Sequence, residues 1–64
     1  MRHTEFWSRL ETAVGPTQAR SWARMLVMPA LGNRTASEAL DAGEDPKVVW
    51  AAVHRELELP ESER

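Results

Sequence analysis

Apolar residues recur along this chain at intervals of three and four positions, which places them on one side of an α-helix. We expect no strands, because no segment alternates apolar and polar residues at a spacing of two. The first stripe predicts a helix near residues 4–14, which Thr4 would cap and Gly15 would end. Its members are Phe6, Trp7, Leu10, Ala13 and Val14.

A second stripe predicts a helix near residues 17–28, with Thr17 as its cap. The stripe consists of Ala19, Trp22, Ala23, Leu26 and Val27. Met28 precedes Pro29, and a residue before proline is biased away from the helical region. We therefore expect "MPALGN" to be an ordered connector that Leu31 holds against the core.

The third segment, near residues 35–42, opens with "TASE", the pattern of a capping box. In that motif the hydroxyl of Thr35 accepts from a backbone amide three residues on, and the carboxylate of Glu38 accepts from the amide of Thr35. Gly43 is expected to end this short helix with a positive φ. The inward positions are Ala36, Ala39 and Leu40.

Asp45 and Pro46 predict the start of a last helix near residues 46–58, because aspartate caps helices and proline suits their first position. Its apolar stripe consists of Val49, Trp50, Val53 and Leu57. Pro60 should end it, and a charged tail, 61–64, follows.

These segments predict an all-α fold: one compact domain over residues 1–60, with four short helices of which the last two form a helix-turn-helix-like hairpin. A chain of 64 residues has room for one domain only. Each of the three tryptophans lies on the stripe of a different helix, so we assign them to the core rather than to a binding surface. The predicted core comprises Phe6, Trp7, Leu10, Trp22, Leu26, Leu40, Val49, Trp50 and Val53.

Composition narrows the possible functions. The chain has no cysteine and two histidines, His3 and His54, so we expect no metal site. Acids and histidines are scattered, and we therefore expect no catalytic residues, no cofactor and no enzymatic activity. The start of the chain lacks the apolar core of a signal peptide, and the longest apolar run, 25–31, is too short to span a membrane. These features predict a cytoplasmic protein without a membrane partner.

Five short motifs support a family resemblance: "MRHTEFW", "SWAR", "RTASEAL", "DPKVVWAAV" and "LELP". In this order and spacing they resemble a small actinobacterial family known as domain of unknown function 3046. The resemblance covers roughly residues 1–60. It implies no particular activity and no catalytic or binding residues, because the family has no established function.

The hairpin over residues 35–58 has the outline of a DNA-binding helix-turn-helix. In that alternative the start of the second helix would enter the major groove, so that Lys47 and Val48 would face the DNA. The acids Glu44 and Asp45 would face it too.

The distribution of charge opposes DNA binding by this hairpin. Residues 1–34 carry five arginines and two glutamates, a net charge of +3, whereas residues 35–64 carry three basic and eight acidic residues, a net charge of −5. Because DNA binding relies on cations that neutralise phosphates, nucleic acid ranks behind protein as the expected partner.

A helical module without catalytic parts is most simply explained as an adaptor or regulator that docks on a larger protein. Its candidate binding residues are Arg20, Arg24, Met25 and Met28, because arginine and methionine are common at interfaces. The two arginines lie off the apolar stripe, and we expect packing not to need them. In the competing interpretation the arginines are solvated and the methionines fill the core under the connector.

Overall fold

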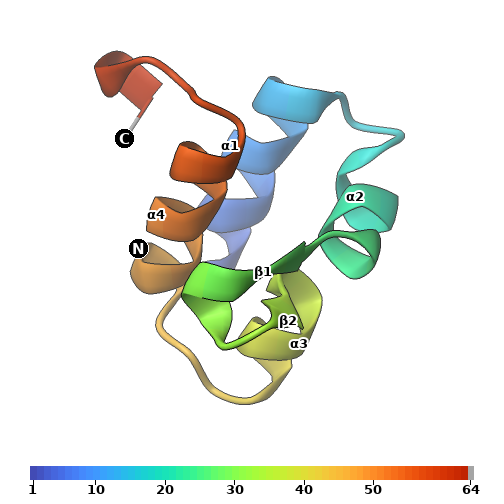
Figure 1. The fold of residues 1–64 in the computed structure, drawn as a ribbon. Coiled ribbons are helices and arrows are strands. Elements are labelled where there is room, and N and C mark those ends of the chain that lie inside the picture. The colour runs from blue at the N-terminus through green and yellow to red at the C-terminus, as the bar shows by residue number, and fades with distance from the viewer. Residues whose placement is uncertain (64) are drawn as a thin grey trace.

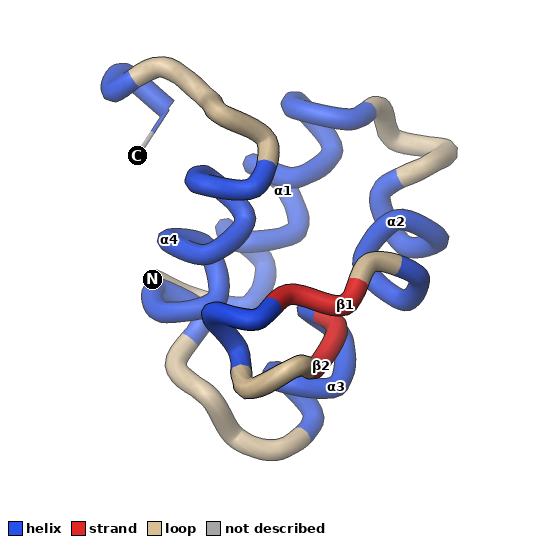
Figure 2. Tube along the Cα trace, in the orientation of Figure 1, coloured by secondary structure: helices blue, strands red, loops and turns tan. Residues whose placement is uncertain are grey.

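The computed structural model describes residues 1–63, most of which are helical (Figure 1, Figure 2). In chain order the elements are α1 (His3–Val14), α2 (Ala19–Met25), β1 (Val27–Met28), a 3₁₀ helix (Pro29–Leu31), β2 (Arg34–Thr35), α3 (Ala36–Asp41), α4 (Pro46–Glu56) and a second 3₁₀ helix (Glu61–Glu63). The four expected α-helices are confirmed, each within a few residues of its predicted bounds. No helix within residues 1–63 has the length and apolar character needed to cross a membrane.

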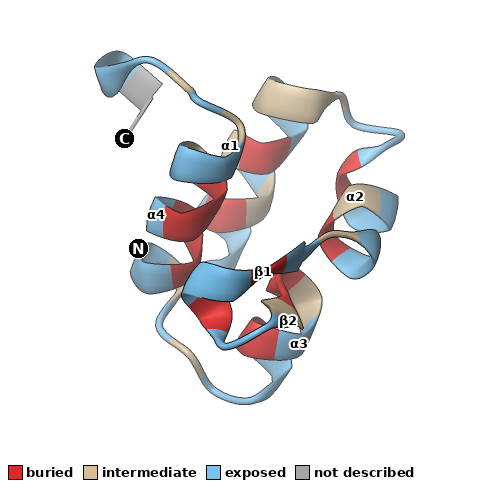
Figure 3. Cartoon of the chain, viewed as in Figure 1, coloured by how far each residue is buried: buried red, intermediate tan, exposed pale blue. Residues whose placement is uncertain are grey.

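The four α-helices make a closed ring of contacts. Each helix contacts the next one along the chain, and α4 returns to contact α1. Figure 1 shows α1 and α4 side by side, with α2 across the molecule from α4. The buried positions of all four helices face the middle of this ring and form one small core (Figure 3).

The prediction that strands would be absent is wrong, because β1 and β2 form a short antiparallel pair. In its register Val27 is opposite Thr35, and Met28 is opposite Arg34. Met28 has extended backbone angles (φ −116°, ψ 124°), as expected for a residue that precedes Pro29. The fold is therefore mainly helical with a two-stranded sheet, not purely α.

The connector between the two strands reverses the chain within a few residues. After its 3₁₀ helix come two residues in the left-handed region, Gly32 (φ 72°) and Asn33 (φ 61°). Glycine and asparagine adopt this region more readily than other residues. Leu31 is buried, which confirms that it holds the connector against the core. The connector is thus the loop of a small β-hairpin.

The first two helices begin without the side-chain caps that the sequence predicts. α1 begins at His3, one residue before Thr4, and α2 begins at Ala19, two residues after Thr17. Neither helix has a side-chain cap. The amide of Ala19 instead donates to the carbonyl oxygen of Gly15 (3.0 Å), so a backbone turn leads into α2 and the threonine lies inside that turn. The expected capping roles of Thr4 and Thr17 are wrong.

The predicted start and glycine turn of α3 and the predicted start of α4 are confirmed. Thr35 and Glu38 form the reciprocal capping box: the threonine Oγ1 accepts from the glutamate amide (3.1 Å), and the glutamate Oε1 accepts from the threonine amide (2.8 Å). Gly43 has a φ of 91° in the turn that follows α3. At the start of α4, Oδ1 of Asp45 accepts from the amide of Lys47 (2.9 Å). The prediction that Pro60 ends the last helix is wrong, because α4 ends at Glu56 and Glu58 already adopts a positive φ of 52°.

Six of the nine predicted core side chains are buried, and Trp7, Trp22 and Leu26 are only partly buried against the core. Phe6 contacts two tryptophans edge-to-face, with ring centroids 5.3 Å from Trp7 and 5.9 Å from Trp50. Such pairs stabilise beyond simple burial. The core also contains residues beyond those nine: Ala19, Ala23, Met28, Leu31, Ala36, Ala39 and Ala52. Most of these are alanines, whose small side chains allow neighbouring helices to pack closely. The inward positions predicted for Ala36 and Ala39 and the stripe positions Ala19 and Ala23 are thereby confirmed.

Candidate functional site

The structure places the two candidate methionines in opposite environments. The side chain of Met25, at the end of α2, is 79% exposed, whereas Met28 is 1% exposed and belongs to the core. The helix ends at Met25, and the extended strand that follows turns Met28 inward. The sequence left open whether the two methionines are exposed or fill the core. Met28 fills the core, whereas Met25 is exposed. Met28 is not part of the exposed surface.

The two candidate arginines also differ. Arg20 lies over Trp7, with its guanidinium carbon 4.3 Å from the ring centroid, so it joins α2 to α1 by a cation–π contact. The sequence pattern placed Arg20 off the apolar stripe and did not predict this contact with α1. Arg24 is exposed in the last turn of α2, where a cation interacts favourably with the helix dipole. Arg24 and Met25 are the two candidates that face solvent without such a contact to another helix.

A shallow groove of about 550 Å³ runs along α2 beside these residues. Its lining consists of Thr17, Gln18, Ser21, Trp22, Met25 and Leu26. Val27, next along the chain, is 51% exposed. Among the described residues, the large hydrophobic side chains that are exposed are Met25, Val27 and Val48, so two of these three lie at one end of α2. An isolated exposed hydrophobic residue is ordinary, but neighbouring ones beside a groove are typical of an interaction surface. We call this groove, with Arg24 and Val27, the α2 surface.

Sequence reasoning missed Trp22 and Leu26 as members of this surface. Their positions on the apolar stripe predicted full burial, yet both are only partly buried and line the groove. A helical stripe shows which side of a helix is apolar, but it does not show how much of that side its neighbours cover. α2 has only seven residues, and its contacts with α1, α3 and β2 leave Trp22 and Leu26 partly exposed.

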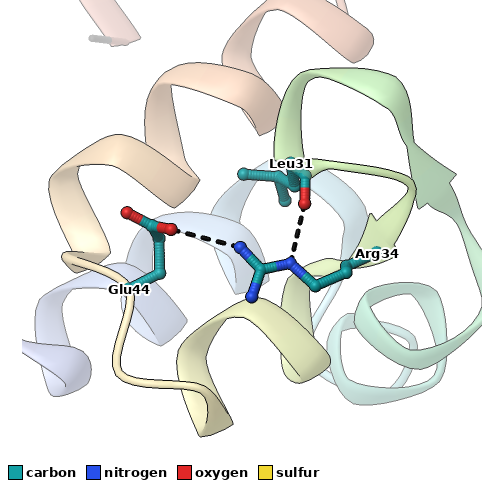
Figure 4. Close-up of polar contacts among 3 residues, drawn as sticks. All are labelled: Leu31, Arg34 and Glu44. Carbon is teal, nitrogen blue, oxygen red and sulfur yellow. Dashed lines mark hydrogen bonds and ion pairs between the residues drawn. The ribbon is translucent and has the colours of Figure 1, made fainter.

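The residues of the DNA-binding alternative lie at the start of α4. Lys47 is exposed and Val48 is 47% exposed. Glu44, which that alternative would bring to DNA, is half-buried and accepts from Nη2 of Arg34 (3.1 Å), while Nε of Arg34 donates to the carbonyl oxygen of Leu31 (2.7 Å) (Figure 4). The acid thus ties the turn between α3 and α4 to the β-hairpin.

The two histidines lie on different helices. His3 is exposed at the start of α1, and the Nε2 atom of His54 on α4 is 2.9 Å from the carbonyl oxygen of Pro60. Within residues 1–63, no three side chains of the metal-binding types are grouped closely enough to hold a metal ion.

The fold and the site together define a small, mainly helical domain with an exposed apolar groove on its second helix. The chain belongs to the family described as "Protein of unknown function (DUF3046)", whose family model matches residues 1–62. The resemblance inferred from the tryptophan-containing motifs is thereby confirmed. Searches of curated proteins and of solved structures found no match.

Proposed function

We propose that this protein is a small non-catalytic module that binds a larger protein through the α2 surface. The observation that carries the proposal is the 79% exposure of Met25, next to an apolar groove and near a second exposed hydrophobic residue, Val27. Methionine is flexible and polarisable, and it adapts to the irregular surface of a partner. Covering these side chains would remove apolar area from water, which favours association.

Charge specifies the chemistry of the partner. Between Glu11 and Glu38 the chain contains three arginines and no acidic residue, and Arg24 directly precedes Met25 of the groove lining. A partner segment that presents an apolar side chain to the groove and a carboxylate to Arg24 would be complementary in both respects. The occupant we propose is therefore an acidic, partly apolar protein segment.

Three further contacts support a binding role rather than catalysis. Of the acids that the sequence places next to each other, Glu44 is paired with Arg34 and Asp45 caps α4. The Nε2 atom of His54 is within hydrogen-bonding distance of a backbone carbonyl. These side chains have structural partners, whereas a catalytic acid or base needs access to a substrate proton.

The test places a photo-crosslinking amino acid at position 25, in the native cell, and identifies the crosslinked protein after nuclease treatment. The matched control carries the same amino acid at position 48, where Val48 is similarly apolar and also exposed, but on α4. The proposal expects a discrete crosslinked protein from position 25 and a much weaker one from position 48.

Two outcomes would count against the proposal. Equal crosslinking from both positions would show that any exposed side chain captures the same protein. Crosslinks that form only from position 48 and disappear with nuclease treatment would favour the DNA-binding alternative.

A further inference from the structure

A second concave site, distinct from the α2 surface, is lined by residues of α1 and α4 and by Met1. These two helices are side by side in Figure 1. The site is a cleft of about 430 Å³. Its lining consists of Met1, Glu5, Arg9, Lys47, Trp50, Ala51, His54 and Arg55. This volume lies within the range of about 300–1,000 Å³ that is usual for small-molecule sites.

The cleft is positive although the protein is acidic. Its charged lining comprises the cations Arg9, Lys47 and Arg55 and the acid Glu5, which gives +3 − 1 = +2, against −2 for the whole chain. Nη2 of Arg9 is bonded to Glu5 at 2.9 Å, so that acid is already neutralised. Lys47 and Arg55 are exposed, and the two ion pairs found within residues 1–63 include neither of them. A concave surface lined by one sign of charge concentrates ions of the opposite sign.

The spacing along α4 separates charge from apolar surface. Lys47, Ala51 and Arg55 follow one another at intervals of four, so they share one face of the helix, and the two cations lie about 12 Å apart along its axis. The small side chain between them leaves the cleft open. The nearly buried Trp50 also contributes to the lining. A ligand in this cleft would meet cations at its edges and apolar surface between them.

We propose that this cleft binds a small organic phosphate ester. The charge of a phosphate monoester near pH 7, about −1.5 to −2, balances the net +2 of the lining. Arginine and lysine both bind phosphate, and the guanidinium of Arg55 can donate two parallel hydrogen bonds to it. The apolar part of the ester would lie against the exposed side chain of Ala51, with the buried Trp50 beneath it.

The same chemistry could be offered by the backbone of DNA, but the surroundings favour a small ligand. Duplex DNA carries one negative charge about every 1.7 Å along its axis. A duplex laid along α4 would pass the exposed acids Asp45 and Glu58 at the two ends of the helix. A phosphate ester contained within the cleft avoids both.

The test is a titration of the ¹⁵N-labelled protein with phenyl phosphate, followed by NMR. We expect a dissociation constant of about 1 mM or below. The largest chemical-shift changes should occur at the amide of Ala51 and the indole N–H of Trp50. Arg55→Gln should weaken binding about fivefold, the effect of one close charge in water, and Lys47→Gln should weaken it less, because Lys47 lies farther along α4 from the phosphate. Arg24→Gln removes the same charge from α2 and should leave the dissociation constant unchanged. The spectra report directly whether each variant is folded.

Inorganic phosphate and a DNA duplex are the comparison ligands. Inorganic phosphate should bind more weakly than phenyl phosphate, because it has no apolar part. The proposal would be overturned if inorganic phosphate bound as tightly as phenyl phosphate, or if the shifts were not localised to the cleft. It would also be overturned if Arg24→Gln weakened binding as much as Arg55→Gln. The proposal would also be overturned if duplex DNA bound more tightly than phenyl phosphate at physiological salt and if Lys47→Gln weakened that DNA binding.

Discussion

The guanidinium of Arg20 lies 4.3 Å from the centroid of the Trp7 ring, and this contact joins α2 to α1. It covers a tryptophan that the core leaves partly exposed. Arg20 therefore has a structural role within the domain, although its sequence position suggested a free cation. Both arginines on α2 are exposed, and of the two only Arg20 has a cation–π contact among the described residues.

Because of this contact, we expect Arg20 to contribute more than Arg24 to the stability of the domain. Arg20→Ala should lower the free energy of unfolding by about 0.5–1 kcal/mol, because it removes a cation–π contact and the packing of the side-chain stem. Arg24→Ala should change it by less than about 0.5 kcal/mol, as is usual for an exposed position. Urea unfolding of both variants measures the difference. Equal effects would mean that the contact with Trp7 contributes nothing.

The capping box should distinguish three threonines that look alike in the sequence. Thr35→Ala should destabilise the protein by about 0.5–2 kcal/mol, because the amide of Glu38 loses its acceptor. Thr4→Ala and Thr17→Ala are the matched controls, since neither threonine caps a helix. Thermal unfolding should place both controls close to the wild type. A large loss in either control would restore the capping roles that the structure does not show.

Arg34 should contribute more than its acidic partner. Glu44→Gln should cost less than about 1 kcal/mol, because both side chains are more than one-third exposed and the ion pair is screened by water. Arg34→Ala also removes the charged hydrogen bond to the carbonyl of Leu31 and should cost about 1.5–3 kcal/mol. Unfolding should be measured at low salt and at about 1 M salt. The higher salt should reduce the destabilisation by Glu44→Gln and largely preserve that by Arg34→Ala. If Glu44→Gln cost more than Arg34→Ala, the ion pair, and not the hydrogen bond to Leu31, would be the main source of stabilisation.

Replacing Gly43 should destabilise the protein through its backbone conformation alone. Its φ is 91°, and a Cβ built at this position has no atom within 4 Å. Gly43→Ala should therefore cost about 1–2 kcal/mol through strain rather than collision. Gly43→Asn should cost less, because asparagine tolerates the left-handed region better. The melting temperatures of the two variants test this order, and an unchanged value for alanine would contradict it.

The parts of the fold that the sequence predicts well depend on local chemistry. The capping box at Thr35, the glycine turn at Gly43 and the start of α4 at Asp45 each involve residues within a few positions of one another. Such contacts form wherever the local pattern occurs, so they can be recognised without knowing the rest of the fold.

The parts that the sequence did not predict depend on contacts between distant segments. The β-hairpin forms because Val27 can pair with Thr35 once the connector has turned, and strands of two residues have no detectable alternation. The contact of Arg20 with Trp7 depends on how α1 and α2 pack. The same is true of the candidate site: the separation of Met25 from Met28 follows from where α2 ends, and helix ends are the least certain part of a periodic pattern.

The central claim is that this protein binds a partner through the α2 surface. The most direct measurement is the dissociation constant for the partner that the position-25 crosslink identifies, compared between Met25→Ser and Val48→Ser. Both variants replace an exposed hydrophobic side chain with the same polar one, on α2 and on α4 respectively. The α2 surface predicts about tenfold or greater weakening for Met25→Ser and no change for Val48→Ser. Wild-type affinity in Met25→Ser, with weakened binding in Val48→Ser, would contradict the claim and move the binding site to α4.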